Sequence, residues 1–130
     1  MIVVDASALL EVLLRTPAAQ TIEAHLLGAT SGLHAPHLLD VEVAQVIRRH
    51  VAHGYVSADR ARASLDELRG MPLTRYPHVA LLPRVWELRH NLSAYDATYV
   101  ALAEALDAPL LTRDRRVAAA IGHHAQVELV

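Results

Sequence analysis

The first ten residues, MIVVDASALL (1–10), carry the pattern that decides the fold. Residues 2–4 are a β-branched run typical of a buried strand, and apolar residues at helical spacing follow Asp5. The segment therefore predicts a strand and then a helix over residues 8–14, with Ser7 as the helix cap. An acid placed between a buried strand and a helix is a candidate functional residue.

The same alternation continues along the chain. Helices are expected over residues 17–27, 37–53, 57–70, 78–90, 93–106 and 114–121, and strand-like segments over 31–35, 109–112 and 126–130. Strands that alternate with helices predict an α/β fold, in which helices cover both faces of a central, mostly parallel sheet of about five strands. At 130 residues, the chain is expected to form one domain, residues 1–130.

The composition excludes several classes of protein. With no cysteine, the chain has neither a disulfide framework nor a thiolate metal site. No apolar run is long enough to span a membrane, and Asp5 and Glu11 interrupt the N-terminal apolar stretch, so we expect no signal peptide and a cytoplasmic location. The formal net charge of −2 argues against a broad basic surface for nucleic acid, unless several acids are gathered around a metal ion.

Four acids occupy positions where chemistry is expected. Asp5 and Asp114 each follow a strand-like segment, while Glu42 and Asp96 lie near the starts of predicted helices. Because ligand sites of open α/β sheets form beyond the carboxyl ends of the strands, these carboxylates could converge on one crevice. Clustered carboxylates repel one another, and Mg²⁺ or Mn²⁺ would offset that repulsion. Such a site supports phosphodiester cleavage.

Each acid also has a structural interpretation. Asp5 and Asp114 could cap the helices that follow them, and Asp96 could be the acidic half of a capping box with Ser93. Glu42 lies on an apolar helix face, where a carboxylate needs a partner or an ion. Asp40 is placed similarly, and periodicity does not decide between the two.

Four phrases of the sequence resemble, in order, the motifs of PIN-domain ribonucleases. They are VDASALL (4–10), EVAQVIRR (42–49), YDATYVALA (95–103) and LTRD (111–114). The resemblance covers essentially the whole chain and is greatest to the VapC toxins of bacterial toxin–antitoxin pairs.

This resemblance implies an acidic tetrad of Asp5, Glu42, Asp96 and Asp114. It further implies Mg²⁺, RNA cleavage that leaves a 5′-phosphate, a homodimer, and a cognate VapB-type antitoxin that enters the acidic crevice with a basic side chain. An apolar fraction of 53% suits a buried subunit interface. Ser7 and Thr112 match the hydroxyl positions of the family, beside the acids, where they would orient a carboxylate or a water molecule.

The chain departs from the family pattern at two places. Gln45 stands where the family often has Asn, and Arg115 and Arg116 follow Asp114 where some relatives have a further acid, which puts a second metal ion in question. Five arginines are candidates for contacts with RNA phosphates, or else ordinary exposed charges: Arg48, Arg49, Arg113, Arg115 and Arg116.

Three other functions fit the sequence less well. His50 and His53 have the spacing of a zinc pair on one helix face, but the arginines beside them indicate a solvated face. A receiver-like phosphoacceptor domain would resemble a pattern with a lysine near the last strand, and the chain contains no lysine. A non-catalytic PIN-like module that binds only a protein has no reason to keep four acids at these positions.

Overall fold

The computed structural model describes residues 1–130, and its centre is a five-stranded sheet. The strands are β1 (Ile2–Val4), β2 (Leu33–Pro36), β3 (Leu73–Tyr76), β4 (Leu110–Thr112) and β5 (Val127–Leu129). They lie in the order β3-β2-β1-β4-β5, and every pairing is parallel. The predicted parallel sheet of about five strands is confirmed.

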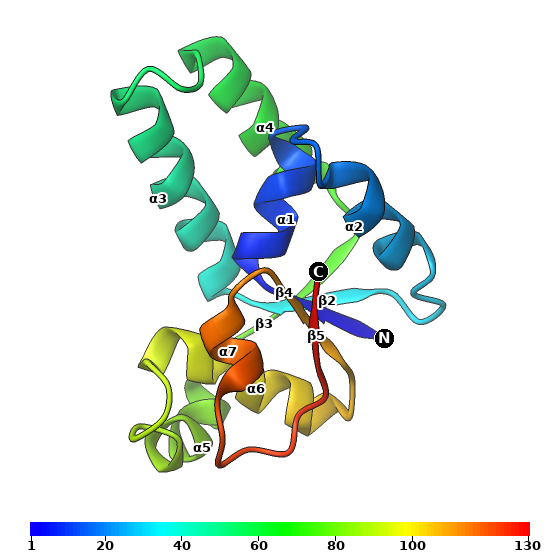
Figure 1. Ribbon diagram of the computed structural model, residues 1–130, viewed down its shortest axis with the longest axis vertical. Coiled ribbons are helices and arrows are strands. Elements are labelled where there is room, and N and C mark those ends of the chain that lie inside the picture. The colour runs from blue at the N-terminus through cyan, green and yellow to red at the C-terminus, as the bar shows by residue number, and fades with distance from the viewer.

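Helices cover both faces of this sheet (Figure 1). On one side lie α1 (Ala6–Leu13), α2 (Ala19–Leu27), α3 (Leu38–Ala52) and α4 (Ala58–Gly70). On the other lie the 3₁₀ turn η1 (Val79–Leu81), α5 (Leu82–Glu87), α6 (Ala94–Leu106) and α7 (Arg115–Ala119). None of these helices has both the length and the apolar character needed to cross a lipid bilayer.

The core lies where the central strands meet α1 and α6. Val3 and Val4 of β1 and Leu110 and Leu111 of β4 are completely buried. In α6, every residue from position 97 to position 103 is buried, as expected for a helix that is apolar all round. α6 packs directly against β1 and β2. Because of this packing, the position of its first turn relative to β1 is fixed.

The strand order creates a topological switch point between β1 and β4. From β1 the chain moves through β2 to β3 at one edge of the sheet, and the remaining strands lie on the opposite side of β1. The chain leaves β1 into α1 on one face and leaves β4 into α7 on the other (Figure 1). A crevice between these two exits is the usual ligand site of an open α/β sheet.

Several predicted details are wrong. Ser7 does not cap α1; the helix begins at Ala6, and Asp5 is the N-cap residue but makes no side-chain cap bond. Strand β3 was not identified, because its sequence Leu-Thr-Arg-Tyr has two polar residues in succession and no alternation of apolar and polar residues. The helix predicted over residues 78–90 is instead η1 followed by the short α5.

Removing packing from a central strand should destabilise the protein far more than the same change at the edge strand. Leu111→Ala should lower the free energy of unfolding by about 2–5 kcal/mol, because Leu111 is completely buried. Leu129→Ala on β5 removes the same atoms from a side chain that is 47% exposed, and should lower it by about 0.5 kcal/mol. Urea denaturation of both variants measures the difference, and equal losses would contradict this account of the core.

Candidate active site

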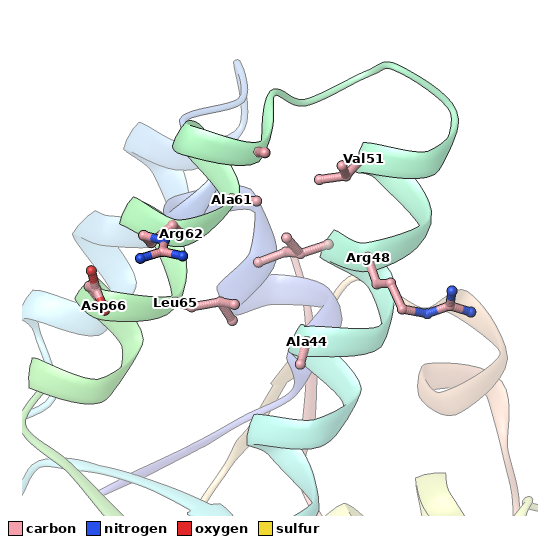
Figure 2. A pocket seen from close by; sticks show the side chains of 9 residues that line it. Ala44, Arg48, Val51, Ala61, Arg62, Leu65 and Asp66 are labelled. Carbon is pink, nitrogen blue, oxygen red and sulfur yellow. The ribbon is translucent and has the colours of Figure 1, made fainter.

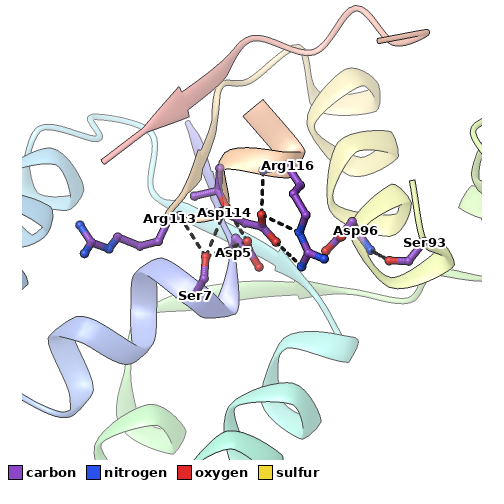
Figure 3. A network of polar contacts seen from close by, with 8 residues as sticks. Asp5, Ser7, Ser93, Asp96, Arg113, Asp114 and Arg116 are labelled. Atoms are coloured by element: carbon purple, nitrogen blue, oxygen red, sulfur yellow. Dashed lines mark hydrogen bonds and ion pairs between the residues drawn. The ribbon is translucent and has the colours of Figure 1, made fainter. Parts of the chain in front are cut away.

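A cleft of about 460 Å³ opens at the switch point, and 13 residues line it. All four predicted acids are among them: Asp5, Glu42, Asp96 and Asp114. They come from the end of β1, the start of α3, the first turn of α6 and the start of α7. Figure 3 shows three of these side chains converging from separate elements, and the structure thus brings the four together in one cleft.

Asp5 is the most buried of the four acids that line this cleft, which we call the acid cleft, and its carboxylate accepts hydrogen bonds from two hydroxyl groups. Asp5 is only 8% exposed. Its Oδ2 accepts hydrogen bonds from Thr112 Oγ1 at 2.6 Å and from Ser7 Oγ at 2.9 Å. Each hydroxyl has one proton, and both protons are directed at this one oxygen. Ser7 and Thr112 therefore stand beside the acid, where the sequence predicted them.

The same two hydroxyls also fix the turn that leads from β4 to α7. Ser7 Oγ accepts the backbone N–H of Arg113 at 3.0 Å, and Thr112 Oγ1 accepts that of Asp114 at 3.0 Å. The bond from Arg113 to Ser7 spans 106 positions and the bond from Thr112 to Asp5 spans 107, while Thr112 also accepts the neighbouring N–H of Asp114, so together they hold Asp5 and Asp114 in a constant relation to each other.

Asp5 is a buried acid without a basic partner. It forms no ion pair with any arginine or histidine, and no hydrogen bond within the protein reaches its Oδ1. Its side chain does not cap α1, so the simpler structural interpretation of this residue is not supported. A carboxylate withdrawn from water with no positive charge near it favours binding of a cation.

Glu42, and not Asp40, is the acid of α3 that lines the cleft. Its Oε1 accepts a 2.6 Å hydrogen bond from the hydroxyl of Tyr99, which is 1% exposed. Burial raises the pKa of Glu42, the Tyr99 bond partly counteracts this, and the charges of Asp5 and Asp96 raise it further. Asp40 instead pairs with Arg75 at 2.7 Å, outside the cleft.

Sequence reasoning missed Tyr99, although one signal for it exists. Tyr99 is a hydroxyl-bearing aromatic within the apolar centre of α6, and a buried tyrosine usually finds a hydrogen-bond partner. The partner is the acid of another helix, 57 positions away in the chain.

Asp96 lies in the first turn of α6, where its backbone is held by Ser93. Ser93 Oγ accepts the backbone N–H of Asp96, but the N–H of Ser93 makes no return bond, so only the serine half of the predicted capping box forms. Burial, followed by the charges of Asp5 and Asp114, raises the pKa of Asp96.

Asp114 both caps α7 and forms an ion pair. Its Oδ1 accepts the backbone N–H of Arg116 at 2.8 Å, and its Oδ2 lies 3.2 Å from the Arg116 guanidinium (Figure 3). These contacts with Arg116 lower the pKa of Asp114. The capping role proposed for Asp114 is therefore confirmed, and the same side chain also lines the acid cleft.

The donor set of the acid cleft suits a hard divalent cation. The oxygens come from carboxylates, which Mg²⁺ and Mn²⁺ prefer. No three acid or histidine side chains stand close enough to form a ready-made cage. Mg²⁺ is commonly held by one or two carboxylates, with water and substrate phosphate completing its shell, so the residues present fit this ion. The histidines proposed for zinc, His50 and His53, pack against Tyr55 and do not line the cleft.

The structure separates the five candidate arginines. Arg49 alone lines the acid cleft and forms no hydrogen bond or ion pair. Arg116 lies beside the cleft but is paired with Asp114, and Arg115 is exposed and outside the lining. Arg113 binds the carbonyl of Val130.

Arg48 borders a second hollow, but its guanidinium points away from α4, and its Nε donates at 3.1 Å to Oε1 of Gln45, which lines the acid cleft (Figure 2). We call this second hollow, between α3 and α4, the α3–α4 groove. Its lining is mostly apolar and includes none of the four acids: Ala44, Ile47, Arg48, Val51, Ala58, Ala61, Arg62, Leu65 and Asp66. Arg48 therefore lies between the two hollows, whereas Arg49 belongs to the acid cleft.

Comparisons with known proteins agree with this geometry. The family model described as the PIN domain matches residues 2–122. The chain is 46% identical over 129 residues to Ribonuclease VapC1 of Mycobacterium tuberculosis, covering 98% of this chain and 96% of that relative. It is 49% identical over 117 residues to Ribonuclease VapC9 of the same organism, covering 90% and 88%.

Solved structures show the same fold at much lower identity. Mycobacterium tuberculosis VapC20, described as a toxin that cleaves the sarcin-ricin loop, superposes with a TM-score of 0.72 at 16% identity, over 92% of this chain and 94% of that one. VapBC2 from Rickettsia felis, bound to a DNA fragment from its promoter, gives a TM-score of 0.73 at 14% identity, over 99% and 98%. With the family match and the two close relatives, these findings place the chain: it belongs to the PIN-domain family and, within it, to the VapC ribonucleases.

Proposed function

We propose that this chain is a Mg²⁺-dependent endoribonuclease, with Mn²⁺ as an alternative ion, and that it acts as the toxin of a type II toxin–antitoxin pair. The observation that carries the proposal is the convergence of four carboxylates at the switch point of the sheet. Relatives at 46% and 49% identity are named ribonucleases, which supports RNA as the substrate.

The four acids, Asp5, Glu42, Asp96 and Asp114, would hold the ion between them, one or two as direct ligands and the others through its water molecules. When bound, Mg²⁺ neutralises charge on the phosphate and lowers the pKa of the attacking water. The protein contributes the orientation of the acids: Thr112 and Ser7 restrain Oδ2 of Asp5, and Tyr99 restrains Oε1 of Glu42. Restrained acids lose little conformational entropy when an ion binds.

We also propose two protein partners. A VapB-type antitoxin would insert a basic side chain into the acid cleft and displace the ion; the naming of the relatives as VapC proteins and the VapBC complex from Rickettsia felis support this. A homodimer would cover part of the exposed apolar surface, which includes Val79, Leu82 and Trp86 on η1 and α5.

Asp5→Asn tests the role of the buried acid, because it keeps the shape of the side chain and removes its charge. RNA cleavage should fall to background. Wild type should gain about 2.7 kcal/mol of stability when Mg²⁺ is present at about 100 times its Kd, whereas the variant should gain much less. Without Mg²⁺ the variant should be at least as stable as wild type, since one member of a repelling cluster has lost its charge. Gel assays of RNA cleavage and thermal melting measure these quantities.

Asp40→Asn is the matched control for this experiment. It makes the same chemical change on an acid that pairs with Arg75 outside the cleft, so cleavage and the Mg²⁺-induced stabilisation should both be retained. If Asp5→Asn cuts RNA at the wild-type rate, or shows the same Mg²⁺-induced stabilisation as wild type, Asp5 is not part of the site.

Arg49→Ala tests whether the free guanidinium in the cleft contacts RNA. The KM for RNA should rise, and the slope of log binding constant against log salt should become shallower by about 1, as expected when one phosphate contact is lost. Arg62→Ala removes the same charge from α4, where Arg62 lines the α3–α4 groove and lies outside the acid cleft, and should leave the slope unchanged. Binding titrations at several salt concentrations decide the matter; identical slopes for the two variants would count against a specific contact at Arg49.

A further inference from the structure

The carboxylates of Asp5 and Glu42 are each hydrogen-bonded on one oxygen and free on the other. Oδ2 of Asp5 accepts the hydroxyl protons of Ser7 and Thr112. Oε1 of Glu42 accepts the hydroxyl proton of Tyr99 at 2.6 Å. No hydrogen bond or ion pair within the protein reaches Oδ1 of Asp5 or Oε2 of Glu42. Each acid thus has one oxygen held by the protein and one oxygen open to a ligand in the acid cleft.

Tyr99 is a rigid donor for its bond to Glu42. The tyrosine is 1% exposed and lies in the part of α6 where every residue from position 97 to position 103 is buried. A ring packed in this way cannot follow the carboxylate of Glu42 if that carboxylate turns. Turning would leave the buried hydroxyl without its acceptor, which is unfavourable. The contact therefore holds Oε1 against α6 and leaves Oε2 as the free oxygen.

Divalent cations differ in how they use a carboxylate. Ca²⁺ surrounds itself with more oxygens than Mg²⁺ does, and it often takes both oxygens of one carboxylate. Mg²⁺ is smaller, requires a nearly ideal octahedron and keeps several water molecules, so it needs fewer carboxylate oxygens. Acids that offer one oxygen each therefore favour Mg²⁺.

Of the two acids, Glu42 depends on a single bond for this restriction. Two hydroxyl protons use both lone pairs of Oδ2 of Asp5. On Glu42, the one bond from Tyr99 keeps Oε1 from joining Oε2 as a second ligand atom. Tyr99 does not line the acid cleft, so it can act on a bound ion only through Glu42.

We propose that the hydroxyl of Tyr99 is a positioning group that makes the acid cleft select Mg²⁺ over Ca²⁺, because it limits Glu42 to one ligand oxygen. This inference rests on the proposed function, with Asp5 and Glu42 as the direct ligands, and it adds a residue that determines which ion the cleft takes. Ser7 and Thr112 restrict Asp5 in the same way.

The test removes the Tyr99 hydroxyl and measures ion binding without RNA. Tyr99→Phe is preferred to changes at Ser7 or Thr112, whose hydroxyls also accept backbone N–H groups of the turn after β4. Tyr76→Phe is the matched control, because it removes a hydroxyl that is hydrogen-bonded to His34, also at 2.6 Å, outside the acid cleft. Thermal melting during titration with MgCl₂ or CaCl₂ gives an apparent Kd for each ion, since an ion that binds only the folded state raises the melting temperature.

Wild type should bind Mg²⁺ more tightly than Ca²⁺. Tyr99→Phe should raise the Kd for Mg²⁺ about tenfold, as loss of a group that orients a metal ligand commonly does. It should leave the Kd for Ca²⁺ unchanged or lower it, because the released Oε1 of Glu42 can serve as a second ligand atom. The preference for Mg²⁺ should therefore fall at least about tenfold. Tyr76→Phe should keep the wild-type preference, even if its melting temperature without ions is lower.

Glu42→Gln shows whether Tyr99 acts through Glu42. An amide has only one oxygen and cannot offer two to a cation. In the Glu42→Gln background, adding Tyr99→Phe should therefore leave the ratio of the two Kd values unchanged, which is the non-additivity expected of two residues in one contact.

Three results would overturn the inference while the proposed function stands. They are a wild type that binds Ca²⁺ more tightly than Mg²⁺, a Tyr99→Phe protein with the wild-type preference, and an equal loss of affinity for both ions in that variant. The first is measured on wild type alone, so it decides the matter even if Tyr99→Phe does not fold. A change of preference that persists in the Glu42→Gln background also counts against the inference. If wild type gains no stability from Mg²⁺, the proposed Mg²⁺ dependence fails, and the inference fails with it.

Discussion

The parallel pairing of β1 with β4 is the constraint on which the site depends. Val3 pairs with Leu110 and Val4 with Leu111, and the ladder continues when the N–H of Asp5 donates to the carbonyl of Leu111 at 3.0 Å. Since side chains alternate along a strand, a slip of one residue would turn Thr112 to the opposite face and away from Asp5. The register that buries the core therefore also aligns the acid with its hydroxyl partners.

The carboxylates of the acid cleft repel one another, and contacts with other residues of the protein only partly offset this repulsion. Hydroxyl protons reach Asp5 and Glu42, and Arg116 pairs with Asp114. The bond between Asp96 and Ser93 uses the backbone N–H of Asp96 and not its carboxylate, and the pKa of that carboxyl group is raised by burial and by its acidic neighbours. Uncharged donors stabilise a carboxylate without neutralising it, and Arg116 is 89% exposed, so water screens its pair. The cluster thus has an excess of negative charge, which a divalent cation would balance.

Local patterns in the sequence were enough to predict the architecture. The contacts between segments that are distant in the chain could not be predicted from such patterns. The run of apolar residues before Asp5 predicts β1, and Ser93 predicts the start of α6, because each pattern depends on neighbours in the chain. Strand β3 was not predicted from the sequence, because its pairing with β2, and not its own composition, makes it a strand. The hydroxyl of Ser7 matches a helix cap locally, but it bonds instead to Asp5 and to the turn after β4. The acids could be named from their places in the pattern, while the choice of Glu42 over Asp40 required the resemblance and then the fold.

The distribution of charge explains how an acidic chain could act on a polyanion. The net charge is −2, but four of the acids are gathered in one cleft, where a bound cation would neutralise part of their charge. Most arginines near the cleft are paired or lie outside its lining, so the attraction for phosphate is concentrated at few points and not spread over a face. Such a distribution predicts little affinity for RNA in general, because few counterions would be released on binding. Recognition of a substrate would then depend on the few nucleotides that fit between the acids and the free guanidinium of Arg49.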